Sequence, residues 1–155
     1  MPLSREVGLT VTEMLDAAEQ GQVRCLYVIG ENPMTSDPDL NHVRHALENT
    51  EFLVLQDMFL TETARLADVV LPACSFAEKD GTFTNSERRV QRVRKAIEPI
   101  GESKDDIWIV QELANRLVEL GAVGPSPEAP YRGWEYASAA DAMAEVNALT
   151  PIYGG

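Results

Sequence analysis

The sequence is poor in cysteine and contains no long apolar run. Only two of its 155 residues are cysteines, Cys25 and Cys74, and they lie too far apart for a metal-binding or disulfide framework. No apolar stretch approaches the roughly 20 residues of a membrane helix, and the first ten residues lack the apolar segment of a secretory signal. We therefore expect a protein of the reduced cytoplasm, with no membrane segment in this chain.

Basic residues are also scarce. The chain contains 13 Lys and Arg and 25 Asp and Glu, which gives a formal net charge of −12. A broad basic face is not expected, and we predict no nucleic-acid partner. Five basic residues nevertheless fall within eight positions. This run suits either a solvated strand face or the lining of a pocket for a polyanionic cofactor or a small anionic substrate. Its members are Arg88, Arg89, Arg92, Arg94 and Lys95.

Three apolar segments predict β-strands, at residues 23–29, 52–55 and 68–72. The first is almost continuously apolar, which is typical of a strand buried on both faces of a parallel sheet. Helices are expected at residues 11–20, at 61–67, and from a start at Asp37 and Pro38 to about residue 49. Cys25 lies within the first strand and is expected in the core, whereas Cys74 follows the third strand and is expected to be accessible.

The alternation of strands and helices with short connections indicates right-handed crossovers and a parallel sheet. The predicted fold class is α/β, a Rossmann-like three-layer domain with a short parallel sheet flanked by helices. After a loop-like and then extended stretch at 73–94, helices are expected at residues 103–120 and 139–149. We assign residues 1–121 to one α/β domain and residues 122–155 to an irregular segment and C-terminal helix of that domain.

The carboxyl ends of the first two strands carry the most informative polar residues, because open α/β sheets bind ligands there. Gly30 follows the first strand and permits a ligand to approach the backbone, and Asn32 and Ser36 lie in the loop behind it. Gln56 and Asp57 end the second strand. The Asp57 carboxylate either accepts hydrogen bonds from a ribose or a guanine edge, or it caps the following turn.

Four segments of the sequence resemble the molybdopterin-dependent oxidoreductases. They are Gly-Glu-Asn-Pro at 30–33, Gln-Asp-Met-Phe-Leu-Thr-Glu-Thr-Ala at 56–64, Ala-Asp-Val-Val-Leu-Pro-Ala at 67–73, and Glu-Lys-Asp-Gly-Thr-Phe-Thr-Asn-Ser-Glu-Arg-Arg-Val-Gln at 78–91. Together they are most similar to the catalytic (alpha) subunits of formate dehydrogenases. A related, non-catalytic subunit occurs in respiratory complex I, so the resemblance covers more than one function.

The resemblance implies that this chain is an internal part of a larger formate-oxidising protein, in which it holds one arm of a bis(molybdopterin guanine dinucleotide) cofactor carrying molybdenum or tungsten. It implies as partners the remaining domains of the parent subunit and electron-transfer subunits, and places the iron–sulfur cluster and the metal-binding cysteine or selenocysteine in segments that this chain lacks. The alternatives are a non-catalytic scaffold or electron-transfer subunit like the complex I relative, and a stand-alone nucleotide-binding module.

The isolated 155 residues are therefore not expected to be active, and no catalytic or metal-binding residue is predicted among them. The family's cofactor contacts correspond to positions at the three strand ends, where Ala73 could contribute only its backbone. Asp57 is added from the strand-end argument. The predicted cofactor-binding residues are Gly30, Asn32, Ser36, Gln56, Asp57 and Ala73.

Overall fold

The computed structural model describes residues 6–122 and 135–153, which fall into two compact units formed by residues 3–73 and 74–155. The first contains α1 (Val11–Glu19), β1 (Cys25–Ile29), α2 (Pro33–Ser36), α3 (Leu40–Asn49), β2 (Phe52–Asp57), the 3-10 helix η1 (Thr63–Arg65) and β3 (Val69–Pro72). The second contains the 3-10 helix η2 (Phe76–Glu78), β4 (Gly81–Thr84), β5 (Val90–Val93), α4 (Asp106–Glu119), α5 (Ala139–Leu149) and the 3-10 helix η3 (Pro151–Tyr153).

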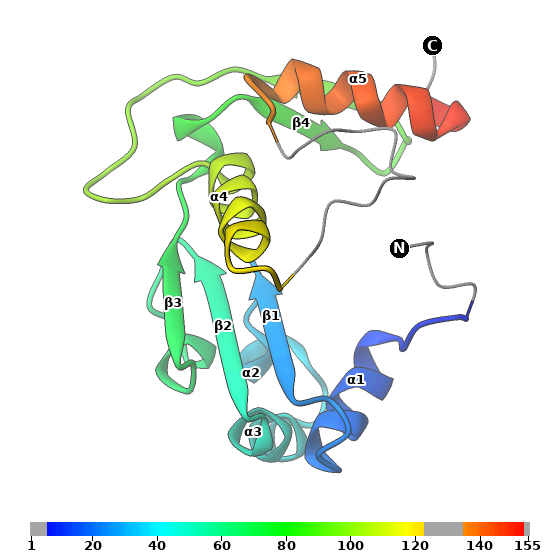
Figure 1. Ribbon diagram of the computed structural model, residues 1–155, viewed down its shortest axis with the longest axis vertical. Coiled ribbons are helices and arrows are strands. Elements are labelled where there is room, and N and C mark those ends of the chain that lie inside the picture. Colours follow the sequence, from blue (N-terminus) through cyan, green and yellow to red (C-terminus); the bar gives the residue numbers. More distant parts are fainter. Residues whose placement is uncertain (1–5, 123–134, 154–155) are drawn as a thin grey trace. The chain divides into compact units, whose positions relative to one another are not determined.

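The first unit is built on a parallel sheet in the order β1–β2–β3, and its three arrows point the same way in Figure 1. Ile29 lies opposite Gln56, and Asp57 lies opposite Pro72. The carboxyl ends of the strands therefore meet at one edge of the sheet. The expected α/β class, with a short parallel sheet flanked by helices, is confirmed.

Helices α1 and α3 pack on one face of this sheet. The strand residues on that face include Leu26, Val28 and Leu53. The opposite face is more open at Ile29 and Phe52, which are both 46% exposed, although Gln56 on that face is fully buried. The expectation that the first strand is buried on both faces was wrong, because its apolar face opposite α1 and α3 is only partly covered. The buried cluster comprises Leu15, Ala18, Met34, Val43, Ala46, Leu47 and Leu53.

The exposure of the two cysteines is the reverse of what the sequence predicted. Cys25 is exposed, because it begins β1 on the more open face of the sheet, and Cys74 is 2% exposed. Burial raises the pKa of the Cys74 thiol. Cys74 begins the 74–155 unit, and its N–H donates to the carbonyl of Lys104 in the same unit at 2.9 Å.

The start of α3 differs from the sequence prediction by two residues. Its N-cap is Asp39, whose Oδ1 accepts the N–H of His42 at 3.1 Å, and not Asp37. A short helix, α2, precedes it where the sequence predicted a loop, and Asp37 ends that helix in an extended conformation. Because α2 ends at Ser36 and α3 begins at Leu40, Pro38 lies in the connection rather than at the first helical position.

The second unit contains an antiparallel hairpin, in which Thr82 of β4 lies opposite Arg92 of β5. The turn is closed by Asn85, whose Oδ1 accepts the N–H of Arg89 at 3.0 Å. Arg88 occupies this turn with φ 64°, in the left-handed region. The strand alternative for the basic run is therefore correct for Arg92 but wrong for Arg88, which lies in the turn with a left-handed conformation, and for Arg94, which follows β5.

Helices α4 and α5 correspond to the two helices expected in the second half of the chain. Asp105 caps α4 and accepts the N–H of Ile107 at 2.8 Å, and Ser138 caps α5 and accepts the N–H of Asp141 at 3.3 Å. Most of the predicted irregular segment, residues 123–134, lies outside the described residues. Across the described ranges, every helix is too short or too polar to cross a bilayer.

Candidate functional site

Gly30 forms a tight turn directly after β1. Its φ of 64° lies in the left-handed region, and its N–H donates to the carbonyl of Gln56 at 2.9 Å. A Cβ atom added to Gly30 would meet no heavy atom within 4 Å. Glycine is therefore required here by the backbone conformation, and the space above it is open at the carboxyl edge of the sheet.

Asn32 connects the loop after β1 with the segment after β2. Its Oδ1 accepts hydrogen bonds from the hydroxyl of Thr63 at 2.7 Å and from the N–H of Thr63 at 3.3 Å, and its Nδ2 donates to Glu62 at 2.9 Å. Thr63 is fully buried and its Oγ1 also accepts the N–H of Met34 at 3.2 Å. The Asn32 amide is therefore engaged within the protein, where it fixes the shape of the strand-end loops.

Ser36 lies at the exposed end of α2, and its hydroxyl donates to the carbonyl of Asn32 at 3.2 Å. Its oxygen keeps the capacity to accept a hydrogen bond. The start of α3 is occupied by the Asp39 carboxylate. A bound phosphate at the α3 N-terminus would therefore face a negative charge that already fills the cap.

Gln56 is fully buried, although it stands at the end of a strand. The hydroxyl of Tyr27 donates a hydrogen bond to the Oε1 of Gln56. This bond joins β1 to β2 on the face opposite the helices. The side chain thus lies inside the protein, and its backbone carbonyl holds the Gly30 turn. Gln56 therefore supports the geometry of the strand-end turn from inside the protein.

Asp57 is the next residue and is only partly buried. Its Oδ1 accepts the N–H of Phe59 at 2.9 Å, so the turn-capping alternative is correct for that oxygen. No described residue donates a hydrogen bond to its Oδ2. The backbone carbonyl of Asp57 accepts the N–H of Ala73 at 3.1 Å, which fixes the ends of β2 and β3 together. The Asp57 carboxylate is therefore fixed in place through Oδ1, and its Oδ2 is available to accept a hydrogen bond from a ligand. We call this group the held carboxylate.

Ala73 is 7% exposed, and its N–H is used by the bond to Asp57. Of its backbone groups, only the carbonyl could contact a ligand. The structure thus brings Gly30, Gln56, Asp57 and Ala73 together through backbone hydrogen bonds at one edge. Asn32 joins them through the segment after β2, and Ser36 lies one short helix farther along the chain.

The sequence analysis missed Glu62 and Thr63, although both lie in one of the segments that carry the family resemblance. The hydrogen bond from Asn32 is the main cause that lowers the pKa of Glu62. Three apolar residues that follow Asp57 are also unusually open, with Met58, Phe59 and Leu60 at 50%, 70% and 69% exposed. The edge thus combines carboxylate acceptors with an apolar loop, which suits a planar base with N–H donors better than a phosphate.

Comparison with known proteins identifies the family. A sequence profile described as "Molybdopterin oxidoreductase" matches residues 2–116, which is well over half of the chain. The chain belongs to the molybdopterin oxidoreductase family. The matched region includes the whole of the sheet and all six predicted site residues.

Several relatives of this molybdopterin oxidoreductase chain are alpha subunits of formate dehydrogenases. The F420-dependent formate dehydrogenase subunit alpha of Methanocaldococcus jannaschii is 48% identical over 99% of this chain and 21% of its own length. The F420-dependent formate dehydrogenase 2 subunit alpha of Methanococcus maripaludis is 57% identical over 74% of this chain and 17% of its own length. The probable oxidoreductase YjgC of Bacillus subtilis is 46% identical over the whole chain and 14% of its own length.

Among solved structures, acetylene hydratase from Pelobacter acetylenicus is similar to this chain with a TM-score of 0.62 and 28% identity. The similarity covers 68% of this chain and 15% of that protein. The chain therefore spans only about 14–21% of the length of the relatives named here. Further domains of a larger parent protein are implied.

Proposed function

We propose that this chain is the part of a formate-dehydrogenase-like alpha subunit that binds the guanine end of one arm of a bis(molybdopterin guanine dinucleotide) cofactor. The family assignment supports a molybdopterin cofactor, and the similarity to formate dehydrogenase alpha subunits supports formate as the substrate of the parent. Residues 1–121 would form the cofactor-binding domain, and residues 122–155 would belong to the same domain.

The observation that carries this proposal is the held carboxylate of Asp57. Guanine presents two neighbouring donors, N1–H and the exocyclic N2–H₂, to a carboxylate that accepts both. The Phe59 N–H fixes Oδ1 at 2.9 Å while leaving it a second lone pair, and Oδ2 is available. The open space above Gly30 would let the rest of the nucleotide pass close to the backbone.

The other predicted residues support this carboxylate from within the protein. The Tyr27–Gln56 hydrogen bond and the Asn32–Thr63 contacts hold the ends of β1 and β2 in a defined geometry before any ligand binds. A preformed site loses less conformational entropy on binding than a mobile one. Asn32 and Gln56 therefore act as positioning residues, and Ser36 and the Ala73 carbonyl would contribute at the margins of the site.

In the parent, oxidation of formate to carbon dioxide releases one proton and two electrons, and the cofactor's molybdenum or tungsten would accept the electrons. The part of this chain that the structure describes would bind and orient the cofactor without taking part in the chemical step. The electrons would leave through iron–sulfur centres in other segments and through partner subunits. A reduced, cytoplasmic location fits the two free thiols, Cys25 and Cys74.

The test uses the full-length parent enzyme with Asp57→Asn, which removes the charge but keeps the side-chain shape. We expect the variant to lose at least about tenfold in cofactor occupancy, since a charge-assisted bond contributes roughly 1.5–3 kcal/mol. Metal content is measured by mass spectrometry, and guanine nucleotide is quantified after acid release from the purified protein.

Glu51→Gln is the matched control, because Glu51 precedes β2 at the opposite end of the strand and pairs there with Arg24 at 2.7 Å. That variant should keep its metal and its nucleotide. Normal metal and guanine content in Asp57→Asn would reject the assigned role of the carboxylate. A parent that holds no pterin after anaerobic purification would favour the non-catalytic scaffold.

A further inference from the structure

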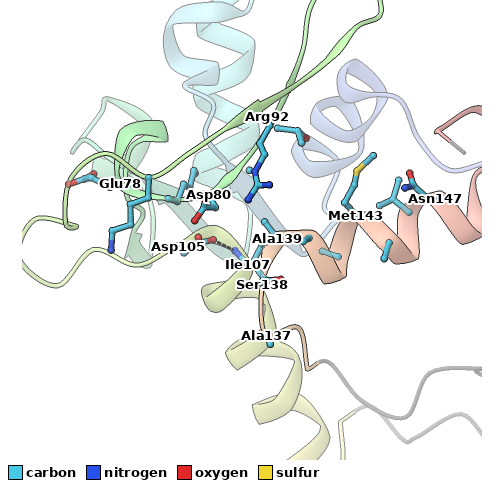
Figure 2. Close-up of a pocket in the computed structure, with 18 of the residues that line it drawn as sticks. Glu78, Asp80, Arg92, Asp105, Ile107, Ala137, Ser138, Ala139, Met143 and Asn147 are labelled. Atoms are coloured by element: carbon cyan, nitrogen blue, oxygen red, sulfur yellow. Dashed lines mark hydrogen bonds between the residues drawn. The ribbon is translucent and has the colours of Figure 1, made fainter. Parts of the chain in front are cut away.

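The second unit contains a cleft of about 900 Å³ that the candidate site does not use. One wall is formed by the hairpin and the residues just before it, and another by α5 over most of its length, from Ala139 to Asn147 (Figure 2). Its volume lies in the range of small-molecule sites, which are mostly apolar with a few convergent polar groups. The residues that matter for the argument are Asp80, Gly81, Arg92, Ala139, Met143 and Val146.

Arg92 is the one cation lining the cleft that has no partner among the described residues. Lys79 pairs with Asp106, and Lys95 pairs with Glu98. The Arg92 side chain extends from β5 into the cleft in Figure 2. A guanidinium in this position offers a planar set of donors that matches a carboxylate or another oxyanion.

The acidic residues of the cleft limit the charge that it can hold. Glu78 already accepts the N–H groups of Ser75 at 2.6 Å and Ile100 at 2.9 Å, and Asp105 caps α4. Asp80 has no partner among the described residues and lies in the same lining as Arg92. One available cation beside one available anion favours a ligand with a single negative charge. A polyanion would be repelled by Asp80.

The α5 wall is apolar and none of its residues is fully buried. Ala139, Met143 and Val146 follow one another at helical spacing along the cleft. Gly81 also lines the cleft. It occupies a strand position without a left-handed φ, and an added Cβ would meet nothing within 4 Å. Neither backbone strain nor internal packing requires a glycine there. A strand glycine of this kind often marks a place where a ligand or another backbone approaches closely, and here it leaves room for a ligand in the cleft.

We infer that this cleft binds an organic monoanion, with its anionic headgroup on Arg92 and its apolar body between Gly81 and α5. The inference is independent of the proposed cofactor site, because it concerns other residues and another unit of the chain. It also gives the basic run a specific role, in which Arg92 binds the anion and the other arginines do not.

The test is a titration of the 155-residue chain with octanoate, followed by ¹H–¹⁵N NMR. We expect saturable shifts of the amides of Gly81, Ala139 and Met143. Arg92→Gln should weaken binding at least about tenfold, as expected for the loss of a charge-assisted contact. Arg94→Gln is the matched control, because Arg94 belongs to the same basic run but is absent from the cleft lining. Its affinity should stay within about twofold.

Two further ligands and one further variant sharpen the result. 1-Octanol has the same chain without the charge and should bind at least about tenfold more weakly, and octyl phosphate as a dianion should not exceed octanoate. Gly81→Val, which suits a strand, should block the cleft without unfolding the hairpin. The inference is overturned if octanoate gives no saturable shifts, if both arginine variants weaken binding equally, or if octanol matches octanoate.

Discussion

The hydroxyl of Thr63 donates a 2.7 Å hydrogen bond to the side-chain carbonyl of Asn32. This contact joins two loops that are 31 residues apart and that each follow a strand of the parallel sheet. Thr63 is fully buried and Asn32 is partly buried, and the contact between them specifies the geometry of the strand-end site.

Replacing Thr63 by valine keeps the shape of the side chain and removes the hydroxyl. The partly buried Asn32 Oδ1 loses one of its two donors from Thr63, and the Met34 N–H loses its acceptor, so the free energy of unfolding should fall by about 1–3 kcal/mol. Urea unfolding of the chain measures this change. Thr35→Val serves as the control, because Thr35 is exposed and should cost about 0.5 kcal/mol or less. Equal losses in the two variants would refute the role assigned to Thr63.

Arg88 is the one non-glycine residue with a positive φ in the described ranges. A left-handed conformation costs an L-residue about 1–2 kcal/mol, which glycine avoids. Part of this gain is lost, because glycine also makes the unfolded chain more flexible and so stabilises the unfolded state. Arg88→Gly should therefore stabilise the chain by about 0.5–1 kcal/mol in thermal unfolding. Arg89→Gly, next to it but without a positive φ, should instead be neutral or destabilising. A destabilised Arg88→Gly variant would contradict this account of the turn.

Glu78 should make the second unit sensitive to acid. Hydrogen bonds from the backbone and side chain of Ser75, and then from the N–H of Ile100, hold its pKa below the ordinary value of 4.5. Because the folded-state pKa is the lower one, its contribution to stability is present above about pH 4.5 and is lost as the pH falls through the folded-state pKa.

The measurement is the free energy of unfolding of wild type and Glu78→Gln over a range of acid pH. The difference in the free energy of unfolding between the two proteins should be largest near neutral pH and should become smaller in acid. Glu98→Gln is the control, since the Glu98 side chain is 86% exposed, and its curve should run parallel to that of the wild type. A gap for Glu78→Gln that does not change with pH would show that its charge is unimportant.

The two cysteines should differ sharply in reactivity. Iodoacetamide should modify the exposed Cys25 in the native chain and leave the buried Cys74 unmodified, since burial raises the pKa of the Cys74 thiol. Peptide mapping should locate one label before unfolding and two labels in urea. Rapid labelling of Cys74 in the native chain would mean that the segment after β3 opens readily.

The strands of the first unit were predictable because apolar runs, flanked by turn residues such as Gly30, define them locally. The α3 start was not predictable, because Asp37 and Asp39 carry equivalent capping signals and only the preceding α2 turn selects Asp39. Cysteine burial was also misjudged, since it depends on which sheet face is covered and not on the neighbouring sequence.

For the candidate site, the rule for strand ends predicted the position of Gly30 and Asp57 at the carboxyl edge of the sheet, where the structure has them. It did not reveal that Gln56 points inward or that Asn32 is bonded to Thr63, because both depend on contacts between residues about 30 positions apart. The capping alternative for Asp57 is correct for Oδ1, and the ligand alternative stays a prediction for which Oδ2 is available.

The central claim is that Asp57 binds a guanine base in the parent enzyme. The most direct measurement is an experimental structure of the full-length parent purified with its cofactor. The account predicts guanine N1 and N2 within about 3.2 Å of the Asp57 carboxylate oxygens. A cofactor bound with no base atom within hydrogen-bonding distance of Asp57 would contradict it.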